Sequence, residues 1–231
     1  MSARRRVVVA GATGLVGAEI VRLLAGRADV EPVALVRRPS AVPVRGVVER
    51  VFDFDDDAHY AALATDGLDA LLCALGTTRR KAGSDEAFLR VDRDLPLRLF
   101  DAAERSGRRP VVGLVSSVGA DSNRGLYLRA KHAVERRLLD GALPYAIVRP
   151  SLLLGDRAES RPVERASAAI GVPLFSALVA GFPSLRLYAP IRAEVVARAL
   201  VSAALDRDMP RVVLEGEPLF AAGGDAASRS I

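Results

Sequence analysis

The feature that most constrains the fold is a short apolar run ending in three evenly spaced glycines near the N-terminus. Residues 7–10 are small, apolar and uncharged, which predicts a strand buried on both faces. Gly11, Gly14 and Gly17 follow, and an apolar helical pattern begins at once. Gly11 allows a sharp turn, Gly14 lets a pyrophosphate approach the backbone, and Gly17 lets the helix lie close to the sheet. The motif therefore predicts a dinucleotide site, with a tight turn lacking any ligand as the alternative.

The composition narrows the class of protein. The chain has 231 residues, half of them hydrophobic, which is enough for one large α/β domain. Its single cysteine, Cys73, rules out an intramolecular disulfide and a cysteine-based metal site, and no metal is predicted. The N-terminus does not resemble a signal peptide and no apolar run could span a bilayer, so we expect a soluble, cytoplasmic protein. The net charge of +5 is spread along a chain without tryptophan, which favours a small anionic ligand over nucleic acid.

Strand and helix patterns alternate along the first part of the chain. Apolar runs predict strands over residues 7–10, 30–36, 47–52, 68–75, 110–115 and 143–148. Helical patterns lie between them, and the one over residues 84–106 contains Pro96, which we expect to bend or divide it. The alternation predicts an α/β protein with a doubly wound parallel sheet, the Rossmann fold, and helices on both faces.

We expect a single domain over residues 1–231. Residues 1–150 form its cofactor-binding core, and residues 151–220, which begin with an irregular proline-rich stretch, form a substrate-facing portion. That portion includes a predicted helix over residues 192–205 and a predicted strand over 211–214. Residues 221–231 are small and polar and should form a flexible tail.

The end of the second predicted strand indicates which dinucleotide binds. An acidic residue here would bind the ribose 2′-hydroxyl of NAD, whereas Arg37 and Arg38 suit the 2′-phosphate of NADP. We predict NADP(H) in preference to NAD(H), with Arg37 the nearer to the strand; the alternative is that both arginines only solvate a loop. At the next two strand ends, Asp53 is placed to meet the adenine amino group, and Gly76 would allow close approach to a cofactor. The aspartates that follow Asp53 are as well placed to cap a helix.

Four residues have the chemistry needed to move a hydride to or from a carbonyl. Ser116 and Ser117 end the fifth predicted strand, and Tyr127 and Lys131 lie one turn apart on the next helix. A tyrosine can donate the proton that the carbonyl oxygen needs if a nearby ammonium favours its ionised form. A serine hydroxyl can hold that oxygen in place. The alternative is a core tyrosine beside a surface lysine.

These motifs resemble the short-chain dehydrogenases/reductases of the extended or atypical kind. The resemblance is carried by residues 11–17 (GATGLVG), 127–131 (YLRAK) and 149–155 (RPSLLLG). Within that superfamily the chain is most similar to the Tat-interacting-protein-like oxidoreductases. The stretches that match them are residues 75–79, 81–83, 90–94, 116–117, 119–121, 156–157 and 159–162.

The resemblance implies how NADPH would be held. The contacts would come from the glycine turn, the following strand ends, the tyrosine–lysine pair and a segment lying against the nicotinamide. These residues are Gly11, Thr13, Gly14, Leu15, Val16, Gly17, Arg37, Asp53, Leu75, Gly76, Tyr127, Lys131, Pro150, Leu152 and Leu153. The implied partner is a small carbonyl substrate, and the chain could act as a monomer or a homodimer.

Two positions depart from the wider superfamily. Ser116 and Ser117 stand 11 and 10 residues before Tyr127, closer than in many members, so either could face the substrate. The asparagine that many ordinary members use in a proton relay has no evident counterpart, because Asp92 is near in sequence but not equivalent. Two other functions stay open: a non-catalytic, NADP(H)-sensing regulatory protein, and a nucleotide-sugar epimerase or dehydratase.

Overall fold

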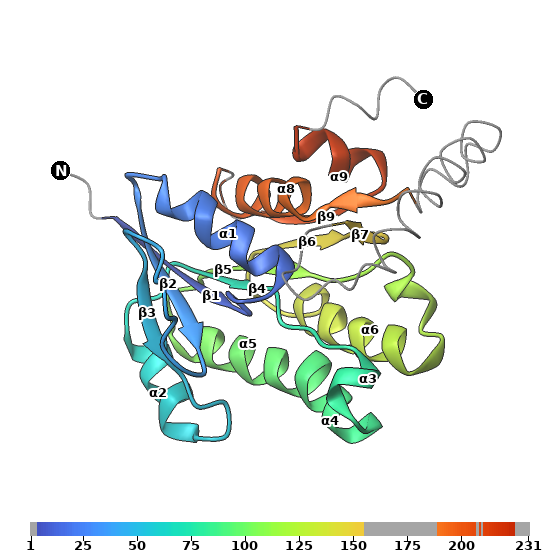
Figure 1. The fold of residues 1–231 in the computed structure, drawn as a ribbon, viewed down its shortest axis with the longest axis horizontal. Coiled ribbons are helices and arrows are strands. Elements are labelled where there is room, and N and C mark those ends of the chain that lie inside the picture. Colours follow the sequence, from blue (N-terminus) through green and yellow to red (C-terminus); the bar gives the residue numbers. More distant parts are fainter. Residues whose placement is uncertain (1–3, 155–188, 207, 209, 225–231) are drawn as a thin grey trace.

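A seven-stranded parallel sheet forms the centre of the molecule (Figure 1). The computed structural model describes residues 4–154, 189–206, 208 and 210–224. The strand order is β3-β2-β1-β4-β5-β6-β9, and every neighbouring pair is parallel. The strands are β1 (Arg5–Ala10), β2 (Val30–Val36), β3 (Val48–Val51), β4 (Ala70–Cys73), β5 (Val111–Val115), β6 (Tyr145–Arg149) and β9 (Arg211–Glu215). The predicted fold class is confirmed, and the strand predicted near residue 211 joins the same sheet.

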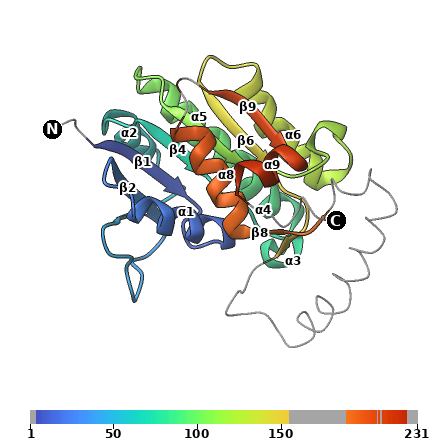
Figure 2. The same ribbon diagram turned by 90° about the horizontal axis from the view of Figure 1, so that it is seen from above.

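Helices cover both faces of this sheet (Figures 1 and 2). One layer holds α1 (Leu15–Ala25), α8 (Ala193–Leu205) and α9 (Glu217–Ala222), and the other holds α2 (Asp57–Thr65), α5 (Leu95–Arg105) and α6 (Gly125–Leu139). Side chains of β1 alternate between the layers, so Val7 packs with α1 and α8 while Val8 packs toward α2 and α5. Both faces of β1 are buried, which explains its unbroken apolar run.

The helix predicted over residues 84–106 is divided just before Pro96. α4 (Asp85–Leu89) leads into a π-helical turn, η1 (Arg90–Asp94), and then into α5. Pro96 has no backbone N–H to donate to the Asp92 carbonyl four residues earlier, so the α-helical register cannot run through this point. The Leu95 N–H donates instead to the Arg90 carbonyl, the spacing of a π-helix. Within this turn the Asp92 side chain is buried.

Short elements complete the described chain. They are α3 (Arg79–Ala82), the 3₁₀ turn η2 (Ala120–Ser122), and a two-stranded parallel sheet of β7 (Leu153–Leu154) and β8 (Ile191–Arg192). α9 extends into the first residues of the predicted tail, while residues 225–231 lie outside the described residues. About half of the predicted substrate-facing portion, residues 155–188, also lies outside them. Among the helices that are described, none is long and apolar enough to cross a membrane.

Candidate functional site

The carboxyl ends of the parallel strands form the edge where the predicted site residues meet. β1 has β2 and β3 on one side and β4, β5 and β6 on the other, so the strand order reverses between β1 and β4. In open α/β sheets, ligands bind beyond the strand ends at this switch point. Gly11 follows β1, Gly76 follows β4 and Ser116 follows β5, so all three lie at this edge.

The glycine turn is as tight as the sequence predicts. Gly11 has a φ of +83°, and a Cβ added to it would lie 2.5 Å from the Ala74 carbonyl oxygen. A Cβ at Gly17 would lie 2.0 Å from the Gly11 carbonyl oxygen, closer than any real contact. At Gly14 the same test gives 3.2 Å to that oxygen. The turn and the close approach of α1 to it therefore require Gly11 and Gly17.

The first turn of α1 can hold an anion through its backbone. The first N–H groups of any α-helix have no carbonyl partner within the helix, and the N-cap Gly14 offers no side chain to accept from them. The positive end of the α1 dipole also points at the carboxyl edge, which favours an anion there. Val16 is buried in the core and Thr13 is exposed. A pyrophosphate would therefore meet the backbone of this segment, not the Val16 side chain.

Arg37 and Arg38 directly follow β2 and are both exposed. Within the described residues neither guanidinium has a hydrogen-bond or ion-pair partner, so both are available for an anion. Asp53 is less free, because its Oδ1 accepts a 2.9 Å hydrogen bond from the Asp55 N–H. Asp56 caps α2 by accepting from the Ala58 N–H at 2.9 Å, as predicted for this acidic cluster.

Lys131 is a buried charged group at this edge, and it is paired with a second one, Asp92. Its Nζ lies 3.0 Å from Oδ1 of Asp92, and the two side chains are 7% and 1% exposed. The other carboxylate oxygen, Oδ2, accepts a 2.8 Å hydrogen bond from the Thr77 N–H. Burial by itself lowers the pKa of Lys131, but the charge and hydrogen bond of Asp92, with Tyr127 nearby, raise it above its ordinary value. Asp92, predicted not to be equivalent to the relay asparagine of the superfamily, therefore lies against the predicted catalytic lysine.

Tyr127 lies beside this pair on the solvent side. Its ring centroid is 5.9 Å from the Lys131 Nζ and 6.2 Å from the ring of Phe88. The residue is 41% exposed, so a ligand at the carboxyl edge can reach it. The four-residue spacing on α6 therefore brings the two residues together, as predicted.

The two serines differ in their surroundings. Ser116 is 4% exposed, and its Oγ is a buried hydroxyl without a hydrogen-bond partner among the described residues. Ser117 is half-buried, and its Oγ donates to the Val118 carbonyl at 3.3 Å. Leu114 packs on the α5 and α6 side, so the alternation of a strand puts Ser116 on that side too.

The segment after β6 is tied to the same edge. The Pro150 carbonyl accepts a 3.0 Å hydrogen bond from the Val118 N–H, and the Leu152 carbonyl accepts one of 2.9 Å from Ile191. The Leu152 side chain is 66% exposed, and Leu153 belongs to β7. Arg149, just before it, donates to both carboxylate oxygens of the buried Glu135, at 3.0 and 2.6 Å. This ion pair fixes the end of β6 to α6.

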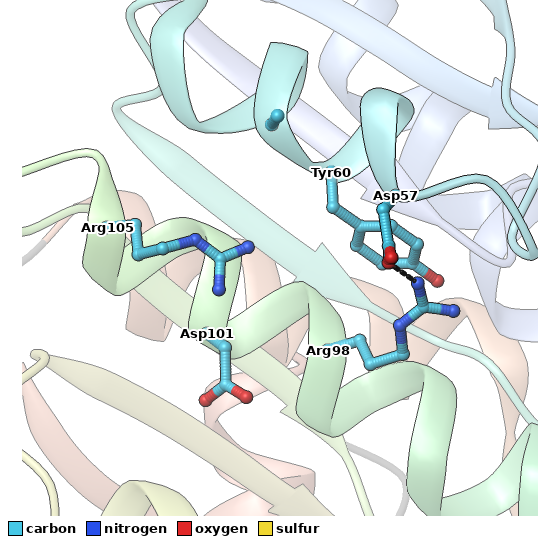
Figure 3. A pocket seen from close by; sticks show the side chains of 6 residues that line it. Asp57, Tyr60, Arg98, Asp101 and Arg105 are labelled. Carbon is cyan, nitrogen blue, oxygen red and sulfur yellow. Dashed lines mark hydrogen bonds and ion pairs between the residues drawn. The ribbon is translucent and has the colours of Figure 1, made fainter.

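A separate hollow of about 370 Å³ lies between α2 and α5 (Figure 3). Six residues line it: Asp57, Tyr60, Ala61, Arg98, Asp101 and Arg105. The Arg98 guanidinium lies 4.1 Å from the centre of the Tyr60 ring and donates to the Phe54 carbonyl at 2.7 Å. These contacts join the two helices, and none of the lining residues belongs to the predicted site.

The fold and this edge define a class of protein: a Rossmann-type domain with a glycine turn and a helix N-terminus at the carboxyl edge of its parallel sheet. The chain matches the NAD(P)H-binding family model over residues 11–173. It belongs to that family, among the atypical short-chain dehydrogenases/reductases.

Relatives and solved structures agree. The chain is 37% identical to protein HTATIP2 of Rattus norvegicus over 166 residues, covering 69% of this chain and 67% of the relative. It is 32% identical over 208 residues to "Protein FMP52, mitochondrial" of Candida glabrata, covering 87% and 86%. Because that relative is named as mitochondrial, the predicted cytoplasmic location stays a prediction.

Two solved structures show the same fold at low identity. One is a UDP-N-acetylglucosamine 4-epimerase from Methanobrevibacter ruminantium M1, with a TM-score of 0.66, 18% identity, and coverage of 95% of this chain and 81% of that one. The other is a short-chain dehydrogenase/reductase superfamily protein from Agrobacterium tumefaciens with bound NAD, with a TM-score of 0.66, 18% identity, and coverage of 98% and 83%.

Proposed function

We propose that this chain is an NADPH-dependent oxidoreductase that reduces a small carbonyl compound. The observation that carries the proposal is the buried Lys131 ammonium 5.9 Å from the accessible Tyr127 ring, at the edge that holds the glycine turn. The Ser116 hydroxyl, also at this edge, has no hydrogen-bond partner in the described part of the chain and supports the proposal. The residues fit a dinucleotide because the helix N-terminus and the exposed arginines offer donors to its phosphates.

Each residue has a distinct role in this proposal. The dihydronicotinamide, when bound, supplies the hydride. Tyr127 donates a proton to the carbonyl oxygen, and the positive charge of Lys131 stabilises the tyrosinate that remains. Ser116 donates a hydrogen bond to the same oxygen; its buried hydroxyl has no partner among the described residues, so a substrate oxygen would satisfy it. Ser117 is the alternative donor, and Ser116→Ala and Ser117→Ala should separate them by the larger loss in kcat.

Cofactor preference is tested by thermal unfolding with NADPH, NADP⁺, NADH and NAD⁺ in separate samples. A ligand at about 100 times its Kd stabilises the folded state by roughly 2.7 kcal/mol. For a chain of this size, that stabilisation raises Tm by about 5–10 °C. We expect this shift with the phosphorylated cofactors, and Arg37→Ala should reduce it more than Arg38→Ala. A larger shift with NAD(H) would contradict the role of Arg37 and favour an epimerase or dehydratase.

Turnover is tested with Tyr127→Phe over a panel of aldehydes and ketones. The variant should bind NADPH as the wild type does and lose most of its activity, because only the proton donor is removed. Tyr145→Phe is the matched control, since Tyr145 begins β6 at the opposite edge of the sheet. Equal turnover in Tyr127→Phe and wild type would refute the assignment. NADPH binding without turnover on any carbonyl would favour the NADP(H)-sensing regulatory protein.

A further inference from the structure

Asp92 connects three segments that lie far apart in sequence. Its carboxylate belongs to η1, pairs with Lys131 on α6 at 3.0 Å, and accepts the Thr77 N–H just after β4 at 2.8 Å. A Cβ added to Gly76 would lie 3.5 Å from the same carboxylate, so this turn also packs against it. One side chain therefore holds a lysine and a strand end in a fixed relation.

We propose that Asp92 is a positioning residue of the candidate site, which holds the Lys131 ammonium charged and in place beside Tyr127 and fixes the turn after β4. The proposal rests on the proposed role of Lys131. It gives a reason for the π-helical turn, because Pro96 prevents the regular register and the wider turn buries the Asp92 side chain.

No other charged group described near Lys131 can replace Asp92. The titratable groups that act on the ammonium are Asp92 on η1, Tyr127 on α6 and Cys73 on β4. Burial raises the pKa of the Cys73 thiol to about 11, so it is neutral near pH 7. Of these three side chains, Asp92 alone carries a carboxylate. Asp92 is then the charge that offsets the cost of burying an ammonium.

A purely structural role does not explain the choice of residues. A buried ion pair is weak evidence for stability, because an apolar pair of similar volume often serves as well. The chain has 31 arginines and only two lysines, Lys81 and Lys131, yet a lysine stands here. Lysine is a compact charge whose protonation responds to burial, whereas arginine stays charged everywhere. This is the property that a neighbour of a proton donor needs.

The test is a pH titration of the lysine side chains by NMR in the full-length protein. With ¹³C-labelled lysine only two ε-carbon signals are present, and Lys81→Arg assigns them. In wild type, Lys131 should titrate above the ordinary midpoint of 10.5. In Asp92→Asn the midpoint should fall by about one pH unit or more, because burial remains and its counter-charge is gone. Asp94→Asn is the matched control, since Asp94 ends the same turn and pairs with Arg93 at 2.6 Å.

Two results would overturn the proposal. One is an Asp92→Asn protein in which Lys131 titrates as in wild type. The other is a wild-type protein in which Lys131 titrates well below 10.5. This second result needs no variant, so it applies even if Asp92→Asn does not fold. The activity readout is separate: Asp92→Asn should lower kcat and move the alkaline limb of its pH profile to lower pH, and Asp94→Asn should do neither. Absence of turnover in wild type would reject the proposed function, while the NMR titration would still decide the role of Asp92.

Discussion

Gly17→Ala tests the close contact between α1 and the glycine turn. The added methyl carbon would lie 2.0 Å from the Gly11 carbonyl oxygen and 2.7 Å from its carbon, both backbone atoms. Overpacking of this kind costs about 1–3 kcal/mol, because the backbone must move. The higher helix propensity of alanine returns up to about 1 kcal/mol. We expect the free energy of unfolding to fall by about 1–2 kcal/mol.

The measurement is urea-induced and thermal unfolding followed by circular dichroism. The expected loss corresponds to a Tm lower by roughly 2–8 °C for a chain of this length. Gly26→Ala is the matched control, because Gly26 is the C-cap of the same helix and its φ is −83°. A Cβ there would lie 3.6 Å from the Leu23 carbonyl oxygen, an ordinary contact. This control should be neutral or slightly stabilising.

NADPH binding provides the functional half of the test. If α1 moves away to relieve the overlap, its first-turn N–H groups move with it, and the Tm shift caused by NADPH should shrink in Gly17→Ala. Gly26→Ala should keep the full shift. If Gly17→Ala is as stable as Gly26→Ala, the close contact between α1 and the glycine turn is refuted. The reason given for a glycine at position 17 is then refuted with it.

Two more predictions concern groups buried in the described chain. Glu135→Gln should lower the free energy of unfolding by about 3 kcal/mol, because it removes the buried carboxylate that pairs with Arg149 and leaves the more exposed Glu215 and Asp121 at 3.2 and 3.9 Å. The control is Glu19→Gln, which removes the more exposed ion pair between Glu19 and Arg22, and its free energy of unfolding should fall by less than about 0.5 kcal/mol. Equal losses in the two variants would contradict a special cost of breaking the buried Glu135–Arg149 pair. Cys73 is fully buried with a pKa of about 11, so a thiol reagent at pH 8 should label it only after unfolding. Rapid labelling of the native protein would show that β4 opens.

The parts of the fold that sequence predicted well are those set by local rules. The strand at residues 7–10 follows from an uncharged apolar run, and the limits of α1 follow from Gly14 and Gly26 at its ends. The Tyr127–Lys131 contact follows from one turn of helix. None of these depends on knowing which distant segment lies opposite.

The parts that sequence missed depend on distant partners. The burial of Lys131 could not be predicted from its own helix, because its partner Asp92 lies 39 positions away. One local signal was present: Pro96 denies a hydrogen bond to the Asp92 carbonyl, so an irregular turn at that residue could be expected. The choice between Ser116 and Ser117 had a similar signal in the alternation of β5, but its use requires knowing which layer contains the lysine.

Polar groups at the carboxyl edge fall into two kinds, and the difference explains how such a site could work. Lys131 and Asp92 pair with each other within the fold, and Asp92 also accepts from the Thr77 N–H, so their position does not depend on a ligand. The Ser116 hydroxyl, the first-turn N–H groups of α1 and the Arg37 guanidinium have no such partners within the described residues. The paired groups can set the geometry before binding, and the others can then direct a bound anion or carbonyl toward it. A site with every polar group paired would have nothing to offer a ligand, and a site with none paired would have no fixed geometry.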